Sequence, residues 1–199
     1  MPKKREQNIR KINPRILILC QGETEPIYFK SIKNDKKLIA TVVIKSIKGI
    51  SKQIVEEAIK IAQKEEKQKN PFSAIWTVCD HDNHKYHKEA FELAKKNNVE
   101  IAFSSICFEI WFLLHFEYTC KAFDSGKSLC NYLEKYIKDY DKTNQSYYEK
   151  RLKNNTTNAI QNAEKLRLEQ KNNNPDEQIF DLNPYTNVDK LVNYLIGQG

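Results

Sequence analysis

The sequence predicts an α/β domain built on a mainly parallel sheet. Short apolar runs of strand length alternate along the chain with amphipathic segments of helix length. This alternation is typical of parallel sheets with helices packed on them. Polar or acidic clusters follow three of the expected strands, at the edge where such sheets bind ligands. We therefore expect a four-stranded sheet flanked by helices, with a helical appendage at the C-terminal end.

The first half of the chain supplies two strands and two helices. Residues 15–20 form a continuous apolar run, which is typical of a strand buried on both faces. A helix follows, since Pro26 suits a first helical turn. The β-branched run at 40–47 is the second strand. The next helix spans 51–69, where Ser51 can serve as the N-cap of an amphipathic segment.

The same alternation continues to about residue 118 and then stops. The further strands are expected at 74–79 and 100–104, and the further helices at 84–98 and 107–116. Beyond residue 119 no strand is expected, and helices are predicted at 126–139, 144–170 and 188–196. We divide the chain into a flexible basic arm (1–14), an α/β core (15–118) and a helical region packed on that core (119–199).

The charge of the chain favours polyanionic partners. Its 199 residues carry a formal net charge of +7. In the arm, five basic residues oppose only Glu6, and a second lysine-rich stretch follows Lys127. Such an excess promotes association with nucleic acid but says nothing of the fold. The candidate nucleic-acid-binding residues of the arm are Lys3, Lys4, Arg5, Arg10 and Lys11.

Cysteine usage and hydropathy favour a cytoplasmic protein. None of the five cysteines forms a C-x-x-C pair, which indicates free thiols in a reducing compartment. The N-terminus lacks the apolar stretch of a signal peptide. The apolar runs are shorter than the ~20 residues that a membrane-spanning helix needs, so no membrane partner is expected.

Two carboxylates, Asp80 and Asp82, follow the third expected strand. Alternate residues of an extended chain point to the same side, so the two acids can converge on one point. Like charges repel there unless a cation joins them, and Mg²⁺ takes one or two carboxylates together with waters and phosphate oxygens. The pair therefore predicts phosphodiester or phosphoryl chemistry. The alternative is that one aspartate caps the next helix.

Four further polar residues are site candidates with structural alternatives. Glu23 and Glu25 follow the first strand; they either complement the dipole of the next helix or join the aspartate pair across the sheet. Glu109 lies in an apolar segment, where an acid is costly to bury without a partner. His115 ends the same segment, as a site residue or as a core histidine.

Three spaced motifs and a closing segment occur in order along the chain. They are Cys20-x-Gly22-x-Thr24-Glu25-x-x-Tyr28-Phe29, Trp76-x-x-x-Asp80-x-Asp82, Ser104-x-x-Cys107-Phe108-Glu109-x-Trp111-x-Leu113-Leu114-His115-Phe116 and Asn183-Pro-Tyr-Thr-Asn-Val188-x-x-Leu191. Together they cover nearly the whole chain, and they resemble the RloB family.

The resemblance implies a fold, a cofactor and a biological setting. RloB-like proteins are similar to Toprim-domain proteins, so a Toprim-like, mainly parallel four-stranded sheet is implied. A glutamate after the first strand and an Asp-x-Asp after a later one would bind Mg²⁺, or Mn²⁺ in its place. The family also implies phage defence or restriction, often beside an AAA- or ABC-type ATPase. The residues that match the family pattern are Glu25, Asp80, Asp82, Glu109 and His115.

The chain departs from the family pattern at one position. The usual Cys-Glu-Gly of the first strand is Cys20-Gln21-Gly22 here. A glutamine carries no charge, so it holds a hard cation less well and is no useful general base. A positioned general acid or base contributes roughly 10²–10⁴-fold to a proton-transfer step. Glu23 or Glu25 could substitute, and both remain candidate metal ligands together with Gln21.

We expect a Mg²⁺-dependent nuclease, or a nuclease-like effector, that cleaves DNA or RNA. Its expected role is anti-phage defence together with a partner ATPase. A homodimer is compatible with this role. Asp80 and Asp82 would hold the metal and Glu25 would complete its shell, while Glu109 and His115 orient water or phosphate. The alternative is a catalytically weakened Toprim-like module that binds nucleic acid or the ATPase without cleaving. A primase or topoisomerase is disfavoured because the chain is too short for their accessory domains.

Overall fold

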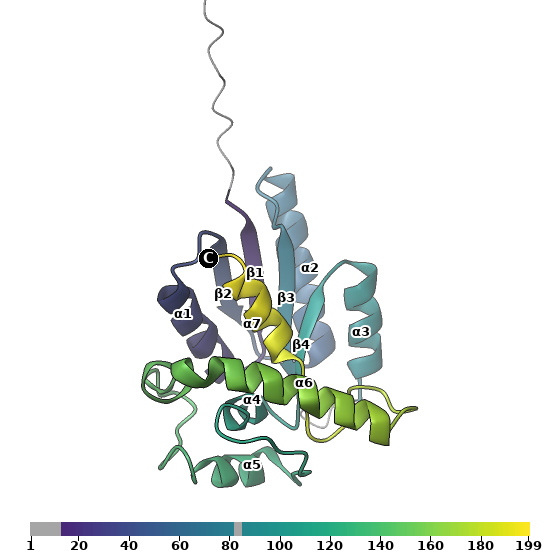
Figure 1. Cartoon of the computed structure of the whole chain (residues 1–199). Coiled ribbons are helices and arrows are strands. Elements are labelled where there is room, and N and C mark those ends of the chain that lie inside the picture. Colours follow the sequence, from purple (N-terminus) through teal and green to yellow (C-terminus); the bar gives the residue numbers. More distant parts are fainter. Residues whose placement is uncertain (1–12, 82–84) are drawn as a thin grey trace, which may run out of the picture.

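A mixed sheet runs through the centre of the molecule (Figure 1). The computed structural model describes residues 13–81 and 85–199. Within them the sheet has five strands in the order β2-β1-β3-β4-β5, of which the first four are parallel. The strands are β1 (Arg15–Cys20), β2 (Thr41–Ser46), β3 (Ala74–Asp80), β4 (Glu100–Ser105) and β5 (Tyr185–Thr186). The parallel sheet and the position of its first four strands agree with the sequence-based expectation.

Helices connect the parallel strands and form most of the C-terminal region. The α-helices are α1 (Thr24–Lys36), α2 (Ser51–Lys67), α3 (His87–Lys96), α4 (Glu109–Leu113), α5 (Gly126–Leu133), α6 (Thr156–Asn173) and α7 (Val188–Ile196). A π-helical turn (Tyr148–Leu152) and a 3-10 turn (Lys153–Asn155) precede α6. The helix expected at 144–170 is therefore interrupted, and those expected at 107–116 and 126–139 are shorter than predicted.

The expectation of a four-stranded sheet is wrong, because β5 adds an antiparallel strand beside β4. The strand has two residues, too few for any periodic pattern to show. The side chain of Asn187 fixes it in place: Oδ1 accepts the backbone N–H of Phe103 at 2.6 Å, and Nδ2 donates to the carbonyl of Ile101 at 3.0 Å. A single buried amide thus replaces the ladder of a longer strand.

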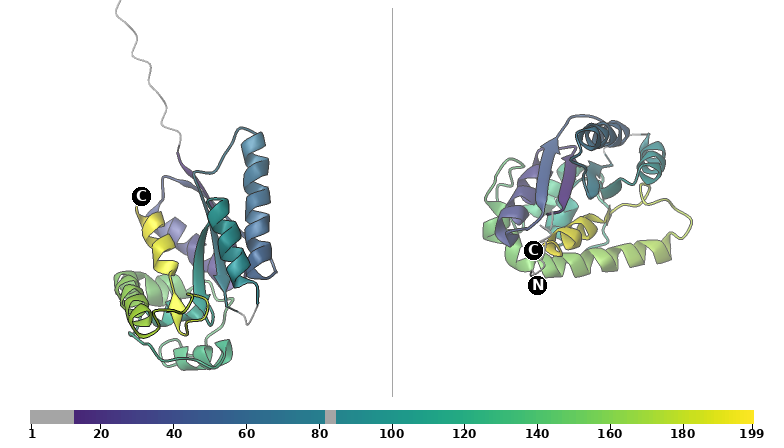
Figure 2. Two further views of the ribbon diagram at one scale, coloured as in Figure 1. Left: turned by 90° about the vertical axis from the view of Figure 1, so that its right-hand side faces the viewer. Right: turned by 90° about the horizontal axis from the view of Figure 1, so that it is seen from above.

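Helices cover both faces of the sheet, as the apolar strand patterns require. In β1, Ile16 and Ile18 point to one face, while Leu17 and Leu19 point to the other. Helices α2 and α3 pack on the second face, and α1, α4, α6 and α7 lie on the first (Figure 2). The two apolar clusters are separated by the sheet, so β1 is buried on both faces.

The C-terminal region is tied to the sheet by charge as well as by apolar packing. Arg167 of α6 forms a bidentate ion pair with Asp189 of α7 and donates to the carbonyl of Thr186 in β5. Asp189 is 1% exposed, so its charge is paired inside the protein. This contact joins α6, α7 and β5 into one unit.

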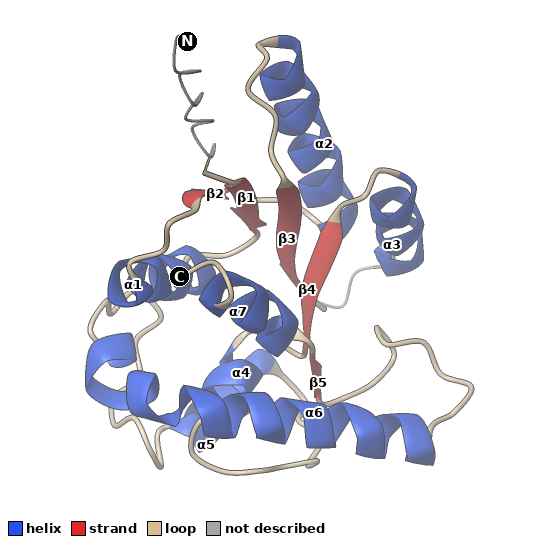
Figure 3. Ribbon diagram, turned by 45° about the horizontal axis from the view of Figure 1, so that its top comes forward, coloured by secondary structure: helices blue, strands red, loops and turns tan. Residues whose placement is uncertain are grey.

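The parallel register brings three strand ends to the same edge. Cys20 of β1 lies opposite Val78 of β3, and Asp80 of β3 lies opposite Ser104 of β4. Figure 3 shows α4, α5 and α6 gathered beyond this edge. The polar residues that follow β1, β3 and β4 therefore face a shared space.

Candidate active site

Gln21 and Asp80 link the ends of β1 and β3. The side-chain oxygen of Gln21 accepts the backbone N–H of Asp80 at 3.2 Å, and the Gln21 N–H donates to the carbonyl of Val78 at 3.0 Å. Gln21 thus holds the two strand ends together. The residue at the position of the family's usual glutamate lies directly beside the last residue of β3.

Glu25 is buried in the first turn of α1, with 2% of its surface exposed. Its Oε1 accepts the backbone N–H of Gly22 at 3.1 Å. A Cβ built on Gly22 would lie 2.5 Å from Glu25 Oε2, so a side chain at this position would displace the carboxylate. Burial raises the pKa of Glu25 to about 7, and repulsion from Glu109 adds to the rise.

Glu109 begins α4 and is 1% exposed. Its Oε1 is paired with Lys142 Nζ at 3.1 Å and accepts the hydroxyl of Tyr140 at 3.0 Å. Burial by itself would lower the pKa of Lys142, but the combined attraction of Glu109, Cys107 and Cys130 outweighs burial and raises it. The Glu109 Oε2 atom has no hydrogen-bond partner among the described residues. One oxygen of this buried acid is therefore paired, and the other lacks a hydrogen-bond partner among the described residues.

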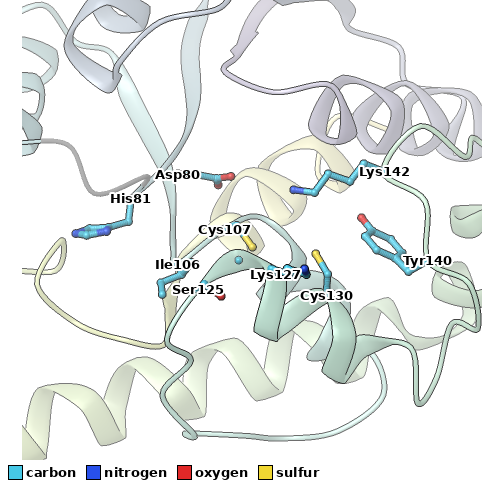
Figure 4. Close-up of a pocket in the computed structure, with 10 residues that line it drawn as sticks. Asp80, His81, Ile106, Cys107, Ser125, Lys127, Cys130, Tyr140 and Lys142 are labelled. Atoms are coloured by element: carbon cyan, nitrogen blue, oxygen red, sulfur yellow. The ribbon is translucent and has the colours of Figure 1, made fainter.

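We call Glu25, Asp80 and Glu109 the acidic cluster. Beside it lies a pocket of about 520 Å³. Its lining residues are Asp80, His81, Ile106, Cys107, Ser125, Gly126, Lys127, Cys130, Tyr140 and Lys142. Figure 4 shows the Asp80 carboxylate and the Lys142 amine directed toward one another across it. Asp80 also lines a second pocket of about 410 Å³ with Gln21 and Lys48. Acids and lysines therefore share one edge of the sheet.

The first turn of α5 forms part of the pocket wall. The Ser125 hydroxyl accepts the backbone N–H of Ser128 at 3.1 Å, and the Ser128 hydroxyl accepts the N–H of Ser125 at 3.2 Å. This reciprocal pair caps the helix. Because Ser125, Gly126 and Lys127 all line the pocket, the positive end of the α5 dipole faces it.

The structure places His115 in the core. The side chain is 2% exposed, and its ring lies 4.9 Å from the Trp111 ring and 6.2 Å from the Tyr28 ring. Its Nδ1–H donates to the carbonyl of Trp111 at 2.9 Å. Burial lowers the pKa of His115 to about 4, so the imidazole is neutral at pH 7. It does not line the pocket.

The other predicted site residues have different placements. Glu23 is exposed before α1, and its side chain does not cap that helix. Asp82 lies outside the described residues, as do Lys3, Lys4, Arg5, Arg10 and Lys11 of the arm. The structure thus brings Gln21, Glu25, Asp80 and Glu109 to one edge, leaves the Glu23 side chain exposed and places His115 in the core.

The donor set suits a hard divalent cation, since carboxylate and amide oxygens are the ligands of Mg²⁺. The unpartnered oxygen of Glu109 is consistent with such a ligand. Among residues 13–81 and 85–199, no three or more His, Cys, Asp or Glu side chains lie close enough together to hold a metal ion. A metal shell would therefore need Asp82 or a movement of the acidic cluster.

Sequence reasoning missed Tyr140, Lys142 and the thiols of Cys107 and Cys130. Tyr140 and Lys142 approach Glu109 from 31 and 33 residues away along the chain, in a loop between helices. The sequence feature that could have indicated them is the lysine- and tyrosine-rich composition after Lys127. This composition indicates basic character, but it does not indicate which residue reaches the acids.

One comparison with known proteins gives a match. The model of the RloB-like protein family matches residues 16–195, which include every residue of the acidic cluster. Neither the curated proteins nor the solved structures contain a match. Within the described residues, no helix is both long and apolar enough to cross a membrane. Because the family match spans nearly the whole chain, this protein belongs to the RloB-like protein family.

Proposed function

We propose that this protein is a Mg²⁺-dependent nuclease with a Toprim-like core, which hydrolyses phosphodiester bonds of DNA or RNA. The observation that carries the proposal is the position of Asp80. It ends a central strand, at the sheet edge that also holds two buried glutamates, and it lines a pocket that also contains Lys127 and Lys142. Acids suited to a cation and amines suited to a phosphate therefore meet at one strand end.

The acids and lysines have distinct roles in this proposal. Asp80 and Asp82 would hold the metal, with Glu25 or the Gln21 amide beside them. When bound, Mg²⁺ polarises the scissile phosphate and stabilises the leaving oxygen. Lys127 and Lys142 line the pocket as partners for phosphate oxygens.

Where the Gln21 amide and not Glu25 lies beside the metal, Glu25 is the candidate general base. A catalytic base works best when its pKa lies near the working pH, and the pKa of Glu25 is raised to about 7. The Gly22 N–H holds its carboxylate in position. Glu109 keeps Lys142 near the pocket through their ion pair. Gln21 cannot take a proton and acts by positioning Asp80.

The Toprim-like core is supported by the arrangement of the four parallel strands. Acidic or amide side chains follow β1 and β3, which lie next to each other in the sheet. This is the placement that the family resemblance implies for a Toprim metal site. The antiparallel β5 is an addition at the far edge of the sheet.

Defence against phage, together with an AAA- or ABC-type ATPase, is the biological role that we propose on the family resemblance. Nucleic acid as substrate agrees with the net charge of +7. Because lysine–phosphate contacts release counterions, we expect binding to weaken steeply as salt rises. A homodimer is part of the same proposal, as two copies would double the basic surface offered to a duplex.

A second candidate function is binding without cleavage. Gln21 favours it, because an amide stands where the family usually has a carboxylate and its oxygen already accepts the N–H of Asp80. The protein would then recruit nucleic acid or the partner ATPase through the same basic pocket. Changing Gln21 to glutamate separates the two functions.

The experiment is a cleavage assay on single- and double-stranded DNA and RNA with Mg²⁺ or Mn²⁺. We expect Asp80→Asn to lower the rate roughly 10²–10³-fold, as does loss of one group that stabilises transition-state charge. We expect Gln21→Glu to raise the rate and Glu23→Gln, at an exposed position, to leave it unchanged. Absence of cleavage by every variant on every substrate would reject the nuclease. Retained binding would then support the second function.

A further inference from the structure

Two thiols from different segments meet in the wall of the pocket. Cys107 lies just before α4, and Cys130 lies in the last half of α5. Figure 4 shows the two side chains on neighbouring parts of one wall of the pocket. Neither thiol has a role in the proposed hydrolysis.

The packing of α5 explains why the two sulfur atoms come together. A Cβ built on Gly126 would lie 3.4 Å from Cys107 Sγ, so this sulfur rests on the first turn of α5. Cys130 follows Gly126 by four residues and thus lies one turn further along the same face of the helix. Both sulfurs occupy the seam between α5 and the residues that precede α4.

Access distinguishes this pair from the other cysteines. Cys20 and Cys79 are fully buried in the sheet, and Cys120 is exposed outside the pocket. Cys130 is half-buried, and it lines the pocket together with Cys107. A small oxidant that enters the pocket therefore meets two neighbouring thiols at once.

Cys130 is the candidate to react first, because it is half-buried whereas Cys107 is buried. Its interaction with the Cys107 thiol lowers the pKa of Cys130 below the ordinary value, and Lys142 acts in the same direction. The thiolate is the nucleophilic form of cysteine. Burial and the same interaction raise the pKa of Cys107, which is suited to react second as the resolving thiol.

We propose that Cys107 and Cys130 form a reversible disulfide when the protein meets hydrogen peroxide. The Cys130 thiolate attacks one peroxide oxygen, the O–O bond breaks, and hydroxide leaves to become water, which yields a sulfenic acid. The Cys107 sulfur then attacks the Cys130 sulfur, and the S–O bond breaks with loss of a second water. Two thiols are oxidised and one peroxide is reduced.

The cross-link would fasten α5 to the start of α4. Cys107 precedes Glu109 by two residues, and the first turn of α5 is part of the pocket wall. Oxidation would therefore restrain one side of the pocket at the acidic cluster. The resulting control of cleavage rests on the proposed nuclease function, whereas the disulfide itself does not.

The test is peptide mapping without reductant after treatment of the whole protein with hydrogen peroxide. We expect a peptide that joins Cys107 to Cys130 and a loss of two of the five free thiols. Dithiothreitol should restore both thiols. The Cys130→Ser variant should lose the joined peptide, while Cys120→Ser, which removes the exposed thiol, should keep it.

Two outcomes would overturn the proposal. One is direct oxidation of Cys130 to sulfinic acid in a protein that remains folded by circular dichroism, with no joined peptide. The other is a cross-link that involves Cys120 in place of Cys107. Because the readout is a mass, a joined peptide in a protein that cleaves nothing would support the disulfide and count against the nuclease alone.

Discussion

The two ends of the segment around α4 bury a polar side chain in opposite ways. Glu109 at its start and His115 just beyond its end are 1% and 2% exposed. Glu109 is met by Lys142 and Tyr140 from a distant loop. His115 is met by aromatic rings and by a carbonyl of its own helix. Equal burial thus gives a paired acid at one end and a neutral imidazole at the other.

The different surroundings of Glu109 and His115 distinguish a candidate site from the apolar core. At the carboxyl edge of the sheet, Glu25 and Glu109 repel one another, and Lys142 is the cation that offsets both. Within the part of the chain that the structure describes, His115 makes no ion pair, and the rings of Tyr28 and Trp111 pack against it. Burial of a titratable group therefore indicates function only where other polar groups converge on it.

The largest effect on stability is expected at His115, in the core. His115 has a pKa of about 4 in the folded protein against about 6.5 when unfolded. The unfolded state binds more protons in this interval, so stability is full above pH 6.5 and falls on acidification toward pH 4. The loss amounts to about 3 kcal/mol, at 1.36 kcal/mol per pKa unit.

Urea denaturation of the wild type and His115→Phe from pH 7 to pH 4 measures this loss. The neutral ring of phenylalanine should remove the contribution and leave the rest of the pH dependence in place. Identical curves for the two proteins would mean that His115 is accessible to protons when folded, contrary to its burial.

At Glu25, in the candidate site, the pH dependence of stability has the opposite sign. The pKa of Glu25 is raised, so the folded state binds the extra proton; its contribution is full below pH 4.5 and is lost as the pH rises through about 7. We expect an effect no larger than that at His115, because the two pKa shifts are about equal in size. Denaturation of Glu25→Gln between pH 5 and pH 8 tests it, and a loss of stability toward pH 5 assigned to Glu25 would contradict the sign.

Lys142 should matter more than its neighbour Lys127. Replacing Lys142 with methionine leaves Glu109 with one partner fewer, which we expect to cost about 1 kcal/mol because the lysine side chain is half-exposed. Lys127→Met is the matched control, since Lys127 lines the same pocket and makes no ion pair within the described residues. Equal changes in denaturation midpoint at pH 8 would show that the ion pair contributes nothing.

The smallest effect is expected from Gly22→Ala. The new Cβ would displace the Glu25 carboxylate, for a net loss of up to about 1 kcal/mol. Gly197→Ala is the control: there a Cβ meets its nearest atom at 3.5 Å, and the backbone is helical. Alanine at such a position is neutral or slightly stabilising. Thermal denaturation that ranks the two variants the other way round would contradict the close packing at Gly22.

The sequence was sufficient to predict the strands and helices that have a long periodic pattern of apolar residues. The first four strands and α2 match their predicted positions closely, because their apolar residues repeat over six or more positions. β5 could not be predicted, as its placement depends on the Asn187 side chain and not on any pattern of its own. The prediction of a helix at 144–170 did not include the π-helical and 3-10 turns that precede Thr156.

The candidate site was predictable only in part, for a similar reason. Strand ends fix where Gln21 and Asp80 lie, so their proximity follows from the parallel sheet. The approach of Lys142 and Tyr140 depends on how the C-terminal helices pack, and no local signal encodes it. His115 shared a motif with Glu109, but it lies six residues further on, beyond the end of α4, where its side chain is in the core.

Metal binding tests the central claim most directly. Titration calorimetry with Mg²⁺ at pH 6, in two buffers of different ionisation enthalpy, measures both the affinity and the protons released. We predict that binding releases close to one proton, because Glu25 with a pKa of about 7 is mostly protonated at this pH and must ionise beside the cation. Glu25→Gln should remove the proton release, and Asp80→Asn should remove the binding. Binding that Asp80→Asn leaves intact, or no binding at millimolar Mg²⁺ or Mn²⁺, would contradict the account.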